Sequence, residues 1–125
     1  MEKEKTCKIV FSDIDGTLLT SDGQITEGTK EMILNLEKKG IPFILTSARS
    51  PEGVRVIKRM LGNHAPIIAF CGGLILDDDG NEIYSKMIPL KRALELKAML
   101  DKDFPAVACN TFGGEKWIVD DRDDW

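Results

Sequence analysis

The chain has 125 residues and a formal net charge of −4, with 42% hydrophobic and 30% charged residues. This length holds one domain, or one domain and part of a second, and the composition is ordinary for a soluble globular protein. The negative charge excludes a general attraction to nucleic acid or anionic membranes, so binding of an anionic ligand needs local donors or a metal ion.

The cysteines and the first residues indicate where the protein acts. Cys7, Cys71 and Cys109 are far apart and form no CxxC pair. This pattern favours a reducing cytoplasm over a secreted disulfide framework. The first 13 residues are charged and then briefly apolar, which predicts neither a signal peptide nor a membrane-spanning helix. We therefore expect a cytoplasmic protein with no nucleic-acid or membrane partner.

Three short apolar runs in the first half of the chain predict buried strands. They comprise residues 7–12, 41–46 and 67–71, and the first ends at Asp13. Such runs are typical of strands that are buried on both faces of a parallel sheet. Cys71, at the end of the third run, is expected to be a small buried hydrophobe.

Two helices are predicted between these strands from their end signals. Thr26 is a typical N-cap, and its helix ends where Gly40 allows a left-handed stop. Ser50 caps a second helix, with Pro51 at the first helical position and Gly62 at the end. The apolar stripe of the first helix consists of Met32, Ile33 and Leu36. Strands and helices that alternate in this way predict a parallel sheet with right-handed crossovers.

The pattern changes after Gly72-Gly73, where the predicted elements are no longer alternating parallel units. They are a hairpin of residues 74–76 and 82–85, a helix from Pro89 to about Lys102, and strands near 106–110 and 116–119. The acidic run of residues 120–124 is expected to be a solvated loop. We place a domain boundary after the hairpin and divide the chain into residues 1–86 and 87–125.

Two carboxylates, Asp13 and Asp15, follow the first strand. The carboxyl ends of strands are where open α/β sheets bind ligands. A carboxylate beside Mg²⁺ stays ionised and can be phosphorylated directly, so Asp13 is the candidate nucleophile. Asp15, the second of two crowded carboxyls, is expected to hold a proton for the leaving oxygen. Gly16 allows the chain to turn so that backbone N–H groups face a phosphate.

The same residue pattern occurs again as Asp77-Asp78-Asp79-Gly80, after the apolar run 74–76. This second copy continues into a polar strand and is typical of a hairpin turn. Turn chemistry is therefore an alternative for the first copy also. The residues alone leave both interpretations of the first copy open.

The run from Asp13 to Leu18 resembles the first motif of the haloacid dehalogenase superfamily, a hydrophobic strand followed by DxDGT. Residues 46–49, Thr-Ser-Ala-Arg, are similar to its second motif, in which a Thr or Ser binds the phosphate; here that residue is Ser47. Residues 71–73, Cys-Gly-Gly, correspond to the Asn-Gly-Ala of the Cof-type branch of sugar-phosphate phosphatases, which the chain most resembles.

The resemblance implies an α/β fold: an HAD-like Rossmannoid core with a parallel sheet in a three-layer α/β/α arrangement, and the start of an inserted α/β cap. It implies that Asp13 and Asp15 are the catalytic and Mg²⁺-binding residues. The phosphate-binding positions that it implies are Ile14, Gly16, Ser47 and Ala48. Arg49 either contacts the substrate or pairs with a nearby carboxylate. The implied substrate is a small phosphorylated metabolite such as a sugar phosphate.

Only two of the superfamily's four motifs are present in the 125 residues. The third motif, a lysine, and the fourth, a Gly-Asp-x-x-x-Asp metal site, follow the cap in the family. We therefore expect the chain to be an inactive N-terminal part of a longer phosphatase that self-associates through exposed edges. A phosphomutase of the same superfamily and a non-catalytic binding module are the alternatives.

Overall fold

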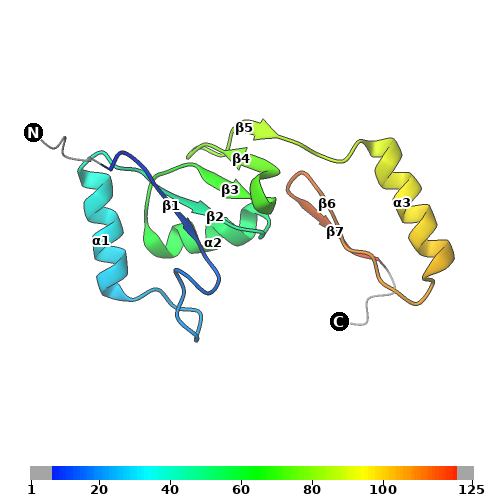
Figure 1. Ribbon diagram of the computed structural model, residues 1–125, viewed down its shortest axis with the longest axis horizontal. Helices are drawn as coiled ribbons and strands as arrows, with labels where there is room; N and C mark the ends of the chain where they lie inside the picture. The colour runs from blue at the N-terminus through cyan, green and yellow to red at the C-terminus, as the bar shows by residue number, and fades with distance from the viewer. Residues whose placement is uncertain (1–6, 121–125) are drawn as a thin grey trace, which may run out of the picture. The chain divides into compact units, whose positions relative to one another are not determined.

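The computed structural model describes residues 7–120 (Figure 1). Its contacts divide the chain into two compact units, Met1–Ser85 and Lys86–Trp125. This division falls one residue before the domain boundary that we placed from sequence. Residues 121–124 of the acidic run that we predicted as a loop lie outside the described residues.

Unit 1 contains a single five-stranded sheet with the order β1-β2-β3-β4-β5. The strands are β1 (Val10–Asp13), β2 (Phe43–Thr46), β3 (Ile67–Ala69), β4 (Leu74–Leu76) and β5 (Glu82–Ser85). The first three are parallel, and β4 and β5 form the antiparallel hairpin that the sequence predicts. The α/β fold class is therefore confirmed.

Two helices form the crossovers, α1 (Glu27–Lys38) and α2 (Pro51–Leu61), and both begin at the predicted caps. The Thr26 hydroxyl accepts the N–H of Thr29 at 3.2 Å, and the Ser50 hydroxyl accepts that of Gly53 at 3.4 Å. Gly62 ends α2 with a φ of 73°, a conformation that glycine adopts without steric cost.

Both helices cover the same face of the sheet, since α1 and α2 contact each other and each contacts β2. Unit 1 thus supplies the sheet and one helical layer. The core between them contains the fully buried side chains of Ile14, Leu45, Val54 and Leu61. Ile14 belongs to this core although it lies beyond the end of β1, so it anchors the loop that follows the strand.

Two sequence predictions about local structure were wrong, those of a buried Phe11 and of a strand at 106–110, and one residue of the predicted apolar stripe is exposed. Phe11 is 55% exposed because β1 is an edge strand with a single neighbour, whereas we expected full burial. Met32, assigned to the apolar stripe of α1, is 65% exposed. Residues 106–110 form no strand; the next strand begins at Thr111.

Unit 2 consists of α3 (Leu90–Asp103) and a two-stranded antiparallel sheet of β6 (Thr111–Gly113) and β7 (Lys116–Ile118). The rings of Phe112 and Trp117 stack across this sheet with their centroids 6.0 Å apart. None of the described residues from 86 to 120 is buried. Unit 2 therefore has secondary structure but no core of its own.

Candidate active site

The carboxyl ends of β1, β2 and β3 lie at one edge of the sheet. Asp13, the last residue of β1, is in register with Thr46, the last residue of β2, and Thr46 is in register with Ile68 of β3. Parallel pairing brings the three following loops to this edge, which is where open α/β sheets bind ligands.

The loop after β1 turns back immediately. The buried Ile14 carbonyl accepts the N–H groups of Leu18 and Leu19 at 3.0 and 3.1 Å. Gly16 has a φ of 73°, which permits this tight turn. Asp13 and Asp15, on either side of the buried Ile14 in sequence, are both exposed. The loop is thus held by the buried Ile14 side chain, while the carboxylates on either side of it stay exposed to solvent.

An open pocket of about 410 Å³ contains most of the predicted site. It is lined by Asp13, Asp15, Thr46, Ser47, Ala48 and Cys71. Four of these residues were predicted as catalytic or phosphate-binding. The side chain of Ile14 lies in the core instead, and its N–H donates to Asp13 Oδ1 at 2.7 Å. Any contact of Ile14 with a phosphate would therefore involve its backbone alone.

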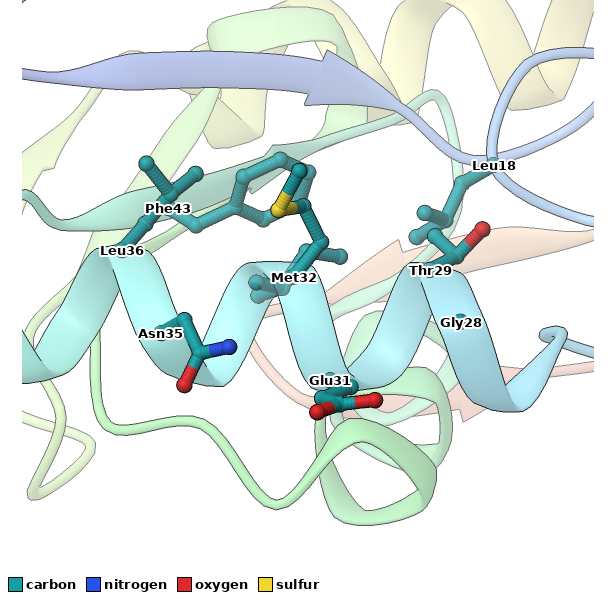
Figure 2. Close-up of a pocket in the computed structure, with 9 residues that line it drawn as sticks. Leu18, Gly28, Thr29, Glu31, Met32, Asn35, Leu36 and Phe43 are labelled. Carbon is teal, nitrogen blue, oxygen red and sulfur yellow. The ribbon is translucent and has the colours of Figure 1, made fainter.

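A larger groove of about 560 Å³ lies along α1, but its chemistry does not suit a phosphate (Figure 2). Figure 2 shows Met32 and Leu36 on the side of the helix that faces Phe43, whereas Glu31 and Asn35 point away from it. The groove is mainly apolar and lacks the strand-end carboxylates of Asp13 and Asp15 and the hydroxyl of Ser47, all of which line the smaller pocket. We therefore place the candidate active site in the smaller pocket at the strand ends.

Asp15 forms a two-point ion pair with Arg49. Arg49 Nε donates to Asp15 Oδ2 at 2.9 Å, and a terminal guanidinium nitrogen donates to Oδ1 at 2.7 Å. These hydrogen bonds hold the pKa of Asp15 below its ordinary value. Of the two roles that we left open for Arg49, the structure shows pairing with a local carboxylate. This pairing favours the ionised form of Asp15, whereas the proton-donor role that we predict from sequence needs its protonated form.

Ser47 is buried and its hydroxyl is oriented by the chain around it. Its oxygen accepts the N–H of Arg49 at 3.1 Å, which leaves the hydroxyl hydrogen available as a donor. The Ser47 N–H donates to the carbonyl of Ile68 at 3.0 Å. This side chain is thus positioned to donate a hydrogen bond into the pocket.

A short turn after β3, Phe70–Gly72, forms the far side of the pocket and was missed by sequence reasoning. Phe70 and Cys71 have φ values of 50° and 53°, in the left-handed region that side-chain-bearing residues rarely occupy. Cys71 is exposed and lines the pocket, so our expectation of a buried hydrophobe was wrong. The alignment of Cys71 with the Asn of the Cof-type Asn-Gly-Ala is the sequence signal that could have placed it at the site.

Comparison with known proteins agrees with this geometry. Residues 10–125 match the family model described as haloacid dehalogenase-like hydrolase. The chain belongs to this family. A Haemophilus influenzae protein named "Putative phosphatase" is 36% identical to this chain over 124 residues, which are 92% of this chain and 47% of that protein.

Solved structures of haloacid dehalogenase-like hydrolases share the fold. One from B. subtilis has a TM-score of 0.71 and 25% identity, covering 85% of this chain and 37% of its own. A sugar phosphatase of HAD subclass IIB has a TM-score of 0.69 and 23% identity, covering 90% of this chain and 43% of its own. The chain spans less than half the length of the curated relatives that it matches first, from 41% to 47%.

The side chains at the pocket supply only some of the oxygen ligands that Mg²⁺ needs, so a bound phosphate and water would have to supply the others. Within residues 7–120 no group of three or more His, Cys, Asp or Glu side chains could hold a metal ion. Asp13 has one oxygen engaged by Ile14 and a second that has no partner among these residues. One or two carboxylates, completed by water and phosphate oxygens, suffice for Mg²⁺ in many phosphate sites.

No helix in the described part of the chain is long and apolar enough to cross a membrane.

Proposed function

We propose that this haloacid dehalogenase-like chain is the N-terminal part of a Mg²⁺-dependent phosphatase that hydrolyses small phosphate monoesters through an aspartyl phosphate. One observation carries the proposal. Asp13 ends a strand, one of its carboxylate oxygens accepts the Ile14 N–H, and the residue lines an open pocket together with Ser47. Such a fixed, accessible carboxylate is suited to nucleophilic attack.

In the first step, Asp13 attacks phosphorus: a bond forms between its carboxylate oxygen and phosphorus, and the bond to the ester oxygen breaks. That oxygen takes a proton from Asp15, which needs its protonated form for this step. In the second step, water attacks the aspartyl phosphate and releases inorganic phosphate. Asp15 accepts the proton of that water, and its ionised form, which the hydrogen bonds from Arg49 favour through a lowered pKa, is the one that does so.

Mg²⁺ would be held by Asp13 and by Asp15, which would first release an oxygen from Arg49, with water and phosphate oxygens as further ligands. When bound, it would neutralise charge on the phosphate. The Ser47 hydroxyl and the backbone N–H groups of Ile14, Gly16 and Ala48 are the proposed phosphate donors, and the Ile14 N–H would have to leave Asp13 Oδ1 to act as one. Neutral donors of this kind stabilise charge that develops in the transition state. Two of these four donor residues, Ser47 and Ala48, line the pocket, which contains no cationic side chain, so a cation would complete its charge balance.

The proposed substrate class is sugar phosphates and similar small metabolites. Its support is the resemblance to the Cof-type branch and the fold shared with a subclass IIB sugar phosphatase. We further propose that residues 87–125 begin an α/β cap. The three free cysteines support action in the reducing cytoplasm.

We also propose that the 125 residues alone are inactive. The chain covers less than half of its relatives, and the lysine and the second metal motif that the family resemblance implies are not in it. Such electrostatic partners supply much of the catalysis of phosphoryl transfer. The exposed edge strand β1 and the coreless unit 2 favour self-association of the isolated chain.

The test is hydrolysis of an aryl phosphate by the full-length protein and by residues 1–125, each in Mg²⁺ and in EDTA. We expect turnover only for the full-length protein in Mg²⁺, and Asp15→Asn should slow it and accumulate phosphoenzyme. Unchanged turnover in EDTA would contradict the metal assignment. Comparable rates for the two proteins would show that the catalytic groups lie elsewhere.

A further inference from the structure

Arg49 holds both oxygens of a single carboxylate from 34 residues away in sequence. The planar guanidinium presents two parallel N–H donors, a geometry that matches a carboxylate at two points. Two such bonds fix the rotation of the Asp15 carboxylate as well as its position. A single hydrogen bond, or a lysine ammonium, would leave that rotation free.

The backbone of Arg49 is itself held from two sides. Its N–H donates to the Ser47 hydroxyl at 3.1 Å, and its carbonyl accepts the N–H of Phe70 at 3.0 Å. A third bond joins the same two loops, from the Cys71 N–H to the Ser47 carbonyl at 2.9 Å. Arg49 is therefore attached to the ends of both β2 and β3 before its side chain reaches Asp15.

These contacts leave Arg49 few free donors with which to bind a substrate directly. The two guanidinium nitrogens that reach the site both donate to Asp15, and Arg49 is not among the residues that line the pocket. A substrate phosphate would have to break the ion pair to engage them. The side chain of Arg49 is only 36% exposed, so its freedom to move elsewhere is limited.

We propose that Arg49 is a positioning residue that acts through Asp15, holding this carboxylate in place at the pocket without binding substrate itself. The proposal rests on the proposed function, in which Asp15 moves the proton. The loops after β2 and β3, which are hydrogen-bonded to each other, hold the Arg49–Asp15 pair in position. Arg49 thus fixes the distance over which Asp15 must transfer a proton.

The test is a double-mutant cycle in the full-length protein with Arg49→Gln, Asp15→Asn and the two combined. We expect Arg49→Gln to lower kcat by about 100-fold, the cost typical of a misplaced catalytic group, with KM within about threefold. In the Asp15→Asn background the same substitution should cost less than about twofold, because the group that it positions is already disabled. Arg49→Lys should fall between wild type and Arg49→Gln, since it keeps the charge without the two-point geometry.

Arg59→Gln is the matched control. Arg59 pairs with Glu52 on α2 at 2.6 Å and does not line the pocket with Asp13, so this variant should keep wild-type kcat and KM. Equal losses from Arg49→Gln in both backgrounds, or a raised KM at unchanged kcat, would overturn the positioning role in favour of direct substrate contact.

A second readout separates this proposal from the proposed function. In residues 1–125, NMR should show the Arg49 Nε–H signal shifted by its hydrogen bond to Asp15, and Asp15→Asn should move that signal while leaving those of Arg55 and Arg59 in place. If the full-length protein has no turnover, the proposed function fails and this signal alone decides the positioning role. An Arg49 signal that is insensitive to Asp15→Asn would overturn it.

Discussion

The molecule contains two copies of the pattern Asp-x-Asp-Gly, and their structures differ. The copy at Asp77 closes the hairpin between β4 and β5. The Asp77 carboxylate accepts the N–H of Asn81 at 2.7 Å and its side-chain amide at 3.0 Å, and the backbone N–H of Asp77 donates to the Asn81 carbonyl at 2.9 Å. Both oxygens of this carboxylate are thus used inside the turn.

The next carboxylate of the hairpin copy is also engaged by neighbours. Asp78 forms an ion pair with Lys58, and its other carboxylate oxygen lies 3.2 Å from Nδ1 of His64. The Lys58 ammonium also donates to the carbonyl of Ala65 at 2.6 Å, and its side chain is only 14% exposed. These pairs attach the hairpin to the end of α2 and the loop after it.

In the copy at Asp13, by contrast, one carboxylate oxygen has no partner within residues 7–120. The difference follows from the strands that precede the copies. After β4 the chain reverses to pair with its own preceding strand, so the acidic side chains satisfy a local turn. After β1 the chain leaves the sheet for a helix, and its strand end stays open beside the ends of β2 and β3. The same residues therefore make a turn or a site according to where the chain goes next.

The largest difference between the two copies is expected when one carboxylate in each is replaced by an amide. In the full-length protein Asp13→Asn should lower turnover by roughly 10,000-fold or more, because the amide is a poor nucleophile. Asp77→Asn should keep turnover within about twofold, as for substitutions remote from a site. Aryl phosphate hydrolysis measures both. An active Asp13→Asn protein would remove Asp13 as nucleophile.

The two glycines provide a second matched pair. Gly16 and Gly80 have φ values of 73° and 89°, so alanine at either position should destabilise the protein by about 1–2 kcal/mol. A new Cβ meets nothing within 4 Å at Gly16 and only the flexible end of Arg55, at 3.3 Å, at Gly80. Urea unfolding should show similar losses, whereas only Gly16→Ala should also lower turnover, by at least about tenfold. Full activity of Gly16→Ala would show that this turn does not orient phosphate donors.

The smallest expected effect is on the ion pairs of the hairpin copy. The hydrogen bond from Lys58, followed by that from His64, lowers the pKa of Asp78. A lowered folded-state pKa means that the pairs stabilise the protein at neutral pH and lose this contribution as the pH falls below about 4. Asp78→Asn should therefore cost about 1 kcal/mol at pH 7 and less at pH 3.

Urea unfolding at the two pH values measures this difference. Glu52→Gln, which removes the exposed partner of Arg59, is the control and should cost less than Asp78→Asn at pH 7. An Asp78→Asn loss that is the same at both pH values would show that the side chain stabilises the hairpin by something other than charge.

Local signals in the sequence predicted local structure well. Thr26 and Ser50 cap the helices because each places a hydroxyl oxygen beside an otherwise unpaired N–H group, an interaction over three residues. The hairpin follows from a turn flanked by two short strands. Asp13 and Ser47 meet in the pocket because parallel strands place their carboxyl ends at one edge, which the order of elements already implies.

Features that depend on distant residues could not be predicted in the same way. The Arg49–Asp15 pair joins two loops, and the sequence offered several carboxylates as partners. The exposure of Phe11 depends on the position of β1 in the sheet order and not on its own apolar sequence. The left-handed turn at Phe70 and Cys71 could not be predicted because neither position is a glycine or an asparagine, the residues that favour a positive φ.

The difference in sequence separation between the two Asp-x-Asp-Gly copies also orders their folding. The contacts of the Asp77 turn span four residues, so this hairpin can close within about 1–10 μs. The pocket of Asp13 requires β1 to pair with β2 across the α1 crossover, and Arg49 to reach Asp15 over 34 residues. Loop-closure entropy opposes such pairing until helix and sheet have packed together. We therefore expect the hairpin at Asp77 to form before the site, and the pairing of β1 with β2 to be slower than the closing of the hairpin.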